Sequence, residues 1–269
     1  MSEHVRVNGL DVWVEQVGEG PDVLLIGGLG DTVESWAFQL EGLADRYRLT
    51  AFDNRGAGRT AMPDEPLSMA KLADDAAGVL GALDISSAHV AGFSGGSLAA
   101  QELALRHPDR VRSLVLQSTW ARADTFLERE FASWRWLMES APSEREFLEW
   151  FYIWVYTPRA HSDGSVDKFM DEVLAFPHQP TTESLQRMLD AIVASDTTDR
   201  LPQITAPTLV LAGGIDLCGR PELGRVVAEL IPDAQFEIME DEAHQPFQER
   251  PEEWNAHVDA FWREVETQA

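Results

Sequence analysis

Short apolar runs recur along the first half of the chain and return near its end. They are rich in Val, Ile and Leu and are bounded by glycine, proline or polar residues, which is typical of strands in a buried sheet. The pattern predicts eight strands, at residues 5–7, 11–17, 23–26, 49–52, 88–93, 113–117, 208–211 and 235–239.

Helical periodicity alternates with the later strands. Strands separated by helices favour a mostly parallel sheet that is covered by helices on both faces. Because no helix separates the first two strands, we expect the sheet to begin with an antiparallel pair. The predicted helices span residues 34–43, 67–83, 95–106, 222–231 and 252–266.

The alternation breaks between Trp120 and Leu201, where helical patterns continue without a convincing strand. A length of 269 residues fits one α/β domain with an insertion or two small domains. The break favours the insertion, so we expect an α/β core formed by residues 1–119 and 201–269 and a helical cap formed by residues 120–200. The cap is rich in Trp, Phe and Tyr, and its helices are interrupted by Pro158, Pro177 and Pro180.

The charge of the chain narrows the range of partners. It carries 21 Lys and Arg against 46 Asp and Glu, a formal net charge of −25. Such a charge repels polyanions, so nucleic acids and anionic membranes are poor partners, and a neutral or cationic small molecule is favoured. The pattern carries no signal for an oligomeric state.

No run of apolar residues is long enough to span a membrane, and residues 1–6 lack the charged and then apolar build of a secretory signal. We therefore expect a cytoplasmic protein. Cys218 is the only cysteine, so no internal disulfide or structural zinc site is expected, and the sequence implies no metal or organic cofactor.

A sharp turn rich in glycine follows the fifth predicted strand. Residues 92–96 read Gly-Phe-Ser-Gly-Gly, a G-x-S-x-G pattern between a strand and a helix of small residues. A serine in such a turn adopts a strained backbone, and the glycines on either side leave room for it. We therefore predict Ser94 as a nucleophile whose hydroxyl projects from the edge of the sheet.

Two later strands end in loops that carry the groups such a serine needs. The strand at residues 208–211 leads to Asp216, and the strand at residues 235–239 leads to His244. A serine hydroxyl needs an imidazole to accept its proton, and an acid fixes the tautomer of that imidazole. The order Ser, Asp, His favours Asp216 as the acid, because the other position, after the sixth strand, offers no carboxylate until Asp124.

The oxyanion of an acyl-transfer reaction needs two backbone N–H groups. Gly95 follows the serine, and the glycine-rich turn after the third strand makes Leu29 the second expected donor. Trp120, Phe93 and Phe247 lie beside the predicted strand ends and are candidates for the lining of a substrate pocket. Aromatic residues at helical spacing more often belong to a core, which is the competing interpretation of the cap.

Three further motifs extend the pattern. Residues 52–60 read Phe-Asp-Asn-Arg-Gly-Ala-Gly-Arg-Thr, residues 107–111 read His-Pro-Asp-Arg-Val, and residues 244–251 read His-Gln-Pro-Phe-Gln-Glu-Arg-Pro. With the Ser, Asp and His motifs, the chain resembles the α/β-hydrolase superfamily, especially its capped esterases, enol-lactonases and perhydrolase-like members. The resemblance implies a serine hydrolase without a cofactor that cleaves a small, largely apolar carboxylic ester or lactone through an acyl-enzyme on Ser94.

The chain departs from many of these relatives at two positions. It has Gly27 and Gly28 where they carry His-Gly, which removes a side chain that usually braces the oxyanion turn, and it has Ala243 where they carry glycine.

Three other functions compete with hydrolysis. Residues 56–61 fit G-x-G-x-x-A, but the prolines that follow at 63 and 66 cannot open the helix that a dinucleotide-binding site requires. A binding protein could keep the fold without turnover, since fold does not fix function. A lyase or cyclase could use His244 to abstract a proton while Ser94 only donates a hydrogen bond.

Overall fold

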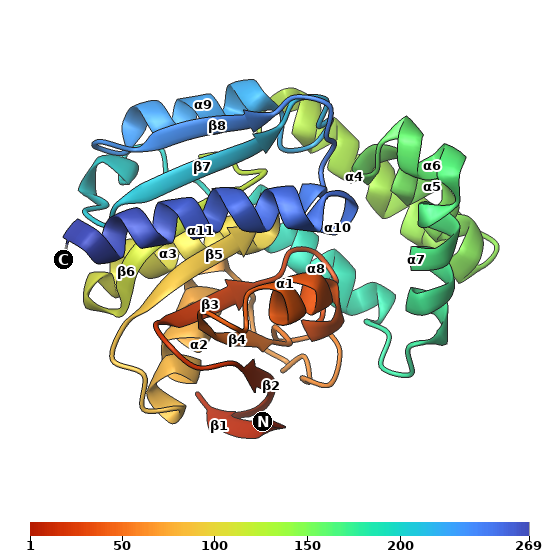
Figure 1. Ribbon diagram of the computed structural model, residues 1–269. Helices are drawn as coiled ribbons and strands as arrows, with labels where there is room; N and C mark the ends of the chain where they lie inside the picture. Colours follow the sequence, from red (N-terminus) through yellow and green to blue (C-terminus); the bar gives the residue numbers. More distant parts are fainter. Residues whose placement is uncertain (269) are drawn as a thin grey trace.

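The computed structural model describes residues 1–268, and a single eight-stranded sheet forms its centre (Figure 1). The strand order is β1-β2-β4-β3-β5-β6-β7-β8, so all eight predicted strands are confirmed, with small shifts at their ends. The strands are β1 (Ser2–Val7), β2 (Leu10–Val17), β3 (Asp22–Ile26), β4 (Arg48–Phe52), β5 (Ala88–Phe93), β6 (Val111–Gln117), β7 (Thr208–Gly213) and β8 (Gln235–Met239).

The sheet begins antiparallel and continues parallel, as the sequence predicted. β2 pairs antiparallel with both β1 and β4, whereas every pairing from β4 to β8 is parallel. Since the carboxyl ends of parallel strands meet at one edge of a sheet, the loops that follow β3, β5, β6, β7 and β8 gather there.

Helices cover both faces of the sheet. A large apolar cluster packs one face against α2 (Met69–Ala82), α3 (Gly95–Arg106) and α9 (Pro221–Leu230). A second cluster packs the other face against α1 (Ala37–Gly42), α10 (Pro246–Glu249) and α11 (Pro251–Gln268), which crosses the front of the sheet in Figure 1. The predicted helix at residues 34–43 begins as a 3-10 turn, Val33–Trp36, and the Asp53 carboxylate accepts the Val33 N–H at its start. Two further 3-10 turns are Pro108–Arg110 and Leu201–Gln203.

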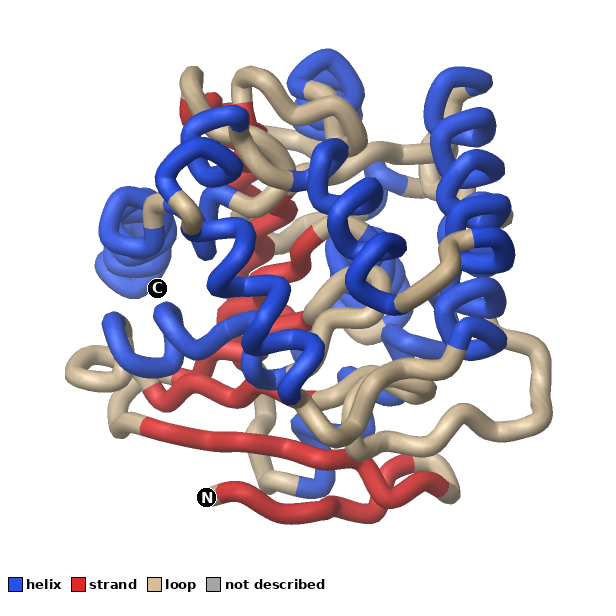
Figure 2. The backbone as a smooth tube through the Cα atoms, turned by 90° about the vertical axis from the view of Figure 1, so that its right-hand side faces the viewer, coloured by secondary structure: helices blue, strands red, loops and turns tan. Residues whose placement is uncertain are grey.

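Five helices between β6 and β7 lie over the carboxyl edge of the sheet (Figures 1 and 2). Their arrangement agrees with an inserted cap, while the division at residues 120 and 200 stays a prediction. Side chains of Asp124, Ser143, Thr157 and Thr181 accept backbone N–H groups at four of the helix starts, which is the usual device for beginning a helix. The helices are α4 (Thr125–Ser140), α5 (Glu144–Val155), α6 (Pro158–Asp163), α7 (Ser165–Ala175) and α8 (Thr182–Val193).

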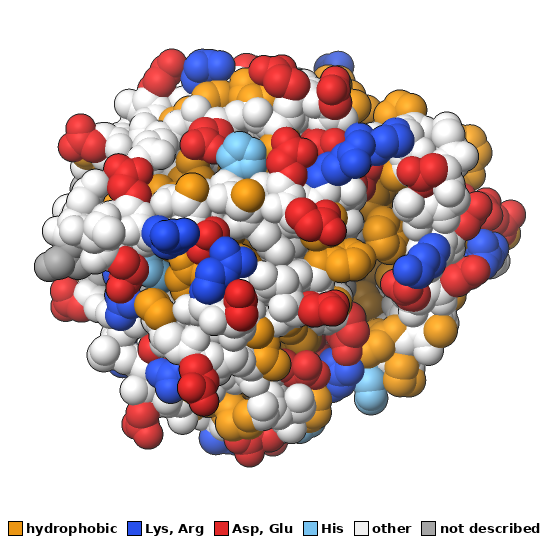
Figure 3. Space-filling model, in the orientation of Figure 1, with side chains coloured by type: hydrophobic (Ala, Val, Ile, Leu, Met, Phe, Trp, Pro, Cys, Tyr) orange, Lys and Arg blue, Asp and Glu red, His pale blue; other side chains and the backbone are white. Residues whose placement is uncertain are grey.

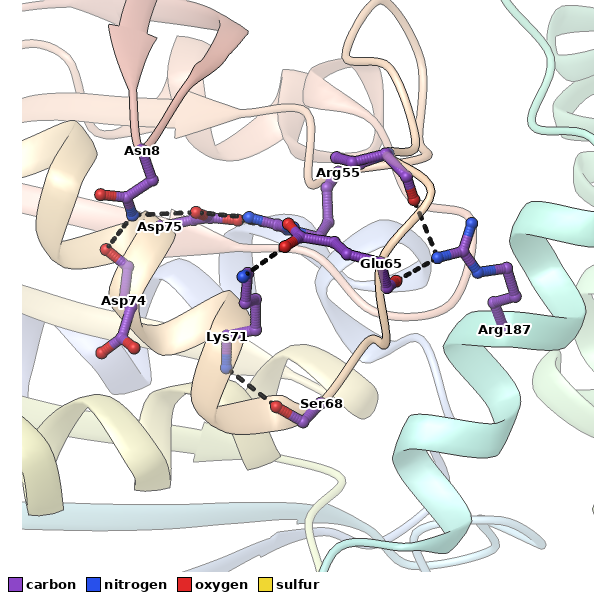
Figure 4. Close-up of polar contacts among 9 residues, drawn as sticks. Asn8, Arg55, Glu65, Ser68, Lys71, Asp74, Asp75 and Arg187 are labelled. Carbon is purple, nitrogen blue, oxygen red and sulfur yellow. Dashed lines mark hydrogen bonds and ion pairs between the residues drawn. The ribbon is translucent and has the colours of Figure 1, made fainter.

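The last cap helix, α8, is anchored to the core by a chain of polar contacts (Figure 4). Arg187 donates to the backbone carbonyls of Pro63 and Glu65 in the loop after β4. The Glu65 carboxylate in turn pairs with the buried Arg55 at 2.6 Å, and both Arg55 nitrogens that face α2 bind the two oxygens of Asp75. This network ties the cap to the first half of the core.

Acidic side chains are spread over the visible face of the molecule, and a hollow lined by hydrophobic side chains separates the core from the cap (Figure 3). Among residues 1–268, no helix has the length and apolar character that crossing a membrane requires.

Candidate active site

Ser94 occupies a strained turn between β5 and α3. Its φ is +52°, in the left-handed region that L residues rarely adopt, and its side chain lies at the carboxyl edge of the sheet. A Cβ at Gly96 would lie 2.2 Å from the Ile26 carbonyl, and one at Gly92 would lie 2.5 Å from the Gly96 carbonyl. Both glycines are therefore required by close backbone contact, as the motif predicted.

The structure brings the predicted serine, histidine and aspartate together. His244 Nε2 lies 2.9 Å from Ser94 Oγ, and His244 Nδ1 lies 2.8 Å from Asp216 Oδ2. All three residues are buried, with Ser94 retaining 9% exposure. In the tautomer that donates from Nδ1 to Asp216, Nε2 is free to accept the proton of the serine.

Asp216 is held by the loop that follows β7. Its Oδ1 accepts the Cys218 N–H at 2.8 Å, which leaves Oδ2 for His244. The Cys218 thiol donates to Glu130 Oε1 on α4, at 2.8 Å. Glu130 of the cap is thus linked to Asp216 through a single residue, Cys218.

The loop that carries His244 is held from both sides. The His244 N–H donates to the Val155 carbonyl at the end of α5, and the His244 carbonyl accepts from the Ser118 hydroxyl. Beside it, Arg159 on α6 pairs with the buried Glu242 at 2.8 Å and with the buried Glu249 at 3.2 Å. The position of the histidine therefore depends on cap residues as well as on the sheet.

The predicted oxyanion donors lie on two neighbouring turns. In residues 1–268, neither the Leu29 N–H nor the Gly95 N–H has a hydrogen-bond acceptor elsewhere in the chain. A Cβ on Gly28 would lie 3.1 Å from Ser94 Cβ, so the turn after β3 lies directly beside the serine. The turn is braced by Asp31, whose Oδ2 accepts the Gly28 N–H at 2.8 Å and whose Oδ1 accepts from the Ser35 hydroxyl at 2.9 Å. Asp31 therefore braces the turn, although the chain has Gly27 in place of a bracing histidine.

Helix α8 covers both turns with apolar side chains. Leu185 Cδ2 lies 3.0 Å from where a Cβ on Gly30 would be, and Ile192 Cδ1 lies 2.8 Å from the same point on Gly95. A side chain at either glycine would require the Leu185 or Ile192 side chain to shift. Met188 lies beside Ile192, so the roof over the serine is apolar.

The three aromatic residues proposed as substrate contacts are all fully buried. Trp120 lies in the cluster that also contains cap residues, 6.0 Å from the ring of Phe131. The Phe93 ring packs 4.9 Å from the His244 ring and 4.8 Å from Phe247, in the cluster on the α11 face. Phe93 therefore packs against the histidine ring and Phe247 packs against Phe93, while substrate contact by any of the three aromatic residues stays a prediction.

The alternative acid, Asp124, has a different role. Its Oδ1 caps α4 by accepting the Leu127 N–H, and its other oxygen pairs with Arg220. It makes no contact with His244.

The ligand atoms of Asp216, Cys218 and His244 lie within 4.8 Å of one another, which is the spacing of a metal site. Asp216 and His244 are already bonded to each other, however, and burial together with Asp216 and Glu130 raises the pKa of the Cys218 thiol well above its usual value. A protonated thiol is a poor metal ligand, so we assign these groups to the triad and its support.

Two carboxyl groups near His244 were missed by the sequence analysis. Burial raises the pKa of Glu130 to about 7, against the opposing effects of Cys218 and His244. Burial also raises the pKa of Asp31, opposed by its two hydrogen bonds and by His244. The position of Asp31 directly after the Gly27–Gly30 turn was a signal that could have been used, whereas nothing local distinguishes Glu130 from the other acids of α4.

An apolar groove of about 550 Å³ lies on the outer side of the triad loops, between them and α5 and α6. Ser94 is not among its lining residues, which include Ile153, Trp154, Ile215, Leu217 and Ala243.

Comparison with known proteins gives consistent matches. The family model described as the alpha/beta hydrolase fold matches residues 21–251. A protein of Azorhizobium caulinodans named "Putative carbamate hydrolase RutD" is 33% identical over 257 residues, covering 95% of this chain and 96% of that protein. A protein of Caulobacter sp. with the same name is 30% identical and covers 88% of each chain.

Solved structures agree. The enol-lactonase of Burkholderia xenovorans has a TM-score of 0.88 at 25% identity, covering 97% of this chain and 99% of that one. A thermophilic esterase of Thermogutta terrifontis has a TM-score of 0.85 at 26% identity, covering 98% and 99%.

Proposed function

Because the chain belongs to the α/β-hydrolase family, we propose that it is a serine hydrolase that cleaves a small, largely apolar carboxylic ester or lactone through an acyl-enzyme on Ser94. The proposal rests on two consecutive hydrogen bonds, one between Ser94 Oγ and His244 Nε2 and one between His244 Nδ1 and Asp216. The buried serine in a strained turn supports the same reading, since strain in this position serves to present the hydroxyl.

In this mechanism Ser94 Oγ attacks the carbonyl carbon while His244 Nε2 accepts its proton. The Leu29 and Gly95 N–H groups donate to the oxyanion, and the partial positive charge at the start of α3 adds to their effect. The imidazolium, oriented by Asp216, then protonates the leaving alcohol. A water activated by His244 attacks the acyl-enzyme, which releases the acid and restores the serine.

The apolar roof of Leu185, Met188 and Ile192 supports a largely apolar substrate group near the scissile bond. The hollow between core and cap supports entry of the substrate from that side (Figure 3). Carbamate cleavage is the second candidate, favoured by the names of the relatives at 33% and 30% identity, and it uses the same groups because a carbamate also carries a carbonyl with a leaving group.

The test compares wild type with Ser94→Ala on short- and medium-chain p-nitrophenyl esters and on p-nitrophenyl N-methylcarbamate. The matched control is Ser86→Ala, an exposed serine in the loop between α2 and β5. A fluorophosphonate probe followed by mass spectrometry locates the modified residue. We expect Ser94→Ala to lower kcat by roughly 10⁴-fold or more and to abolish labelling, with Ser86→Ala unchanged.

Absence of both turnover and labelling in wild type would contradict the proposal and favour a binding protein. Consumption of a substrate without release of an acid would instead favour the lyase or cyclase reading. The ratio of ester to carbamate turnover decides between the two hydrolytic candidates.

A further inference from the structure

Asp31 places a carboxylate inside the proposed active site that the reaction mechanism does not use. A methyl group built on Gly28 would lie 3.1 Å from Ser94 Cβ and 3.2 Å from Asp31 Oδ2, so one side chain's width separates this carboxylate from the nucleophile. Asp31 is only half-buried. Burial raises the pKa of both Tyr152 and Tyr156 at the end of α5, and the charge of Asp31 adds to the rise.

This carboxylate has no Lys or Arg partner among the described residues, although His244 lowers its pKa against the larger effect of burial. Within residues 1–268, neither Lys nor Arg forms an ion pair with Asp31, although 25 ion pairs are formed elsewhere, including those of the histidines. Its bonds come from one backbone N–H and one hydroxyl. On the Cys218 side of His244, Glu130 is 3% exposed, forms no ion pair, and its Oε2 has no hydrogen-bond partner.

When Asp31 is ionised, its negative charge beside the oxyanion hole opposes the reaction of a neutral ester. The oxyanion that develops on the carbonyl and the carboxylate repel each other, and this repulsion is stronger at a half-buried site than in water. A substrate that carries a positive charge removes this penalty, because its cation lies between the two anions.

We propose that Asp31 is the binding group for a positively charged nitrogen of the substrate, so that the enzyme prefers cationic esters over neutral isosteres and rejects anionic ones. The inference rests on the proposed serine hydrolase function and narrows its substrate class. The net charge of −25 acts in the same direction by attracting cations to the molecule.

The test uses three acetate esters that differ mainly in charge: acetylcholine, its neutral isostere 3,3-dimethylbutyl acetate, and 2-sulfoethyl acetate. The variant Asp31→Asn keeps an oxygen for the Gly28 N–H and an amide group that can donate to Ser35, so it removes the charge and retains the brace. At pH 8 we expect the kcat/KM ratio of acetylcholine to 3,3-dimethylbutyl acetate to fall roughly 30-fold, the size of one ion pair at a partly buried site.

Asp233→Asn is the matched control. It removes the same charge from an exposed turn before β8, at the opposite edge of the sheet, where asparagine also accepts the positive φ of 56°. We expect the ratio in this variant to equal that of wild type. Asp31→Ala separates the two roles of the residue, because loss of the brace lowers kcat for all three esters.

The proposal is overturned if Asp31→Asn leaves the kcat/KM ratio of acetylcholine to 3,3-dimethylbutyl acetate unchanged. It is also overturned if kcat/KM falls equally for all three esters, because the Asp31 charge would then act on the His244 imidazolium and not on the substrate. If wild type cleaves no ester and is not labelled at Ser94, the proposed function itself fails. Binding of choline and of 3,3-dimethylbutanol to Ser94→Ala, measured by calorimetry with and without Asp31→Asn, then still tests the cation site. Equal affinity for the two alcohols in both proteins contradicts it.

Discussion

Ser94, Asp216 and His244 are carried on loops that follow buried strands, whereas Glu130, Arg159 and Arg187 come from cap helices whose outer faces meet solvent. The strand-end groups contact one another, and the His244 N–H also donates to the Val155 carbonyl at the end of α5. The cap groups each contact one loop of the core through a charged side chain. This contrast indicates that the sheet supplies the chemical groups, and that the cap sets the stability of their loops and the shape of the cavity.

The largest effect is expected at a strand end. Asp216→Asn keeps an oxygen for the Cys218 N–H but favours the wrong tautomer of His244, so kcat on p-nitrophenyl acetate should fall by about 10⁴-fold while the thermal midpoint changes little. Steady-state kinetics and circular dichroism check the two parts. A variant with kcat within tenfold of wild type would remove Asp216 from the triad.

The second prediction concerns the buried acid of α4. Burial raises the pKa of Glu130 to about 7 in the folded protein, above its value near 4.5 in the unfolded chain. Between pH 4.5 and 7, Glu130 therefore keeps its proton in the folded state and loses it in the unfolded state. The contribution of this proton to the free energy of unfolding is complete below pH 4.5 and is lost as the pH rises through 7. Glu130→Gln removes this loss.

We expect the stability of Glu130→Gln relative to wild type to be greater at pH 8 than at pH 5, by at most roughly 3 kcal/mol. Denaturant unfolding at both pH values measures the difference, and Glu128→Gln, exposed on the same helix, is the control. Identical pH dependence in wild type and Glu130→Gln would show that the carboxyl titrates normally.

Arg159 tests whether the cap holds the histidine loop. Arg159→Met leaves the buried Glu242 and Glu249 without their shared partner, although Arg250 remains 3.4 Å from Glu242. Because Arg159 is about one third exposed, we expect a loss of about 2 kcal/mol in the free energy of unfolding, together with a lower kcat. Thermal denaturation and ester kinetics check this, with Arg129→Met on the outside of α4 as control. A lower stability with unchanged kcat would separate the loop's stability from catalysis.

The smallest effect is expected at the anchor of α8. Arg187→Met removes the contacts with the Pro63 and Glu65 carbonyls, and we expect a loss of about 1 kcal/mol in stability and a higher KM with nearly unchanged kcat. A lower kcat with an unchanged KM would contradict the view that the sheet supplies the chemical groups and that the cap sets the shape of the cavity. Kinetics on a short and a medium acyl chain give both constants.

The sequence by itself determined the strands, the nucleophile turn and the order of the triad, because each depends on neighbouring residues. Alternation and apolar runs predict strands locally, and Gly92 and Gly96 are needed by backbone contacts within the turn and with the adjoining strand end. A sheet whose strands are parallel then brings Ser94, Asp216 and His244 to one edge, even though 150 positions separate the serine from the histidine.

Only the tertiary structure decided which side chains surround that triad. Glu130 meets Cys218 across 88 positions and Arg159 meets Glu242 across 83, and no periodicity within α4 or α6 records such contacts. The same holds for the apolar roof of α8 and for the full burial of Phe93 and Phe247. Asp31 lies next to a motif in sequence, but its place beside Ser94 follows from the adjacency of β3 and β5 in the sheet, because pairing between strands is set by the whole fold.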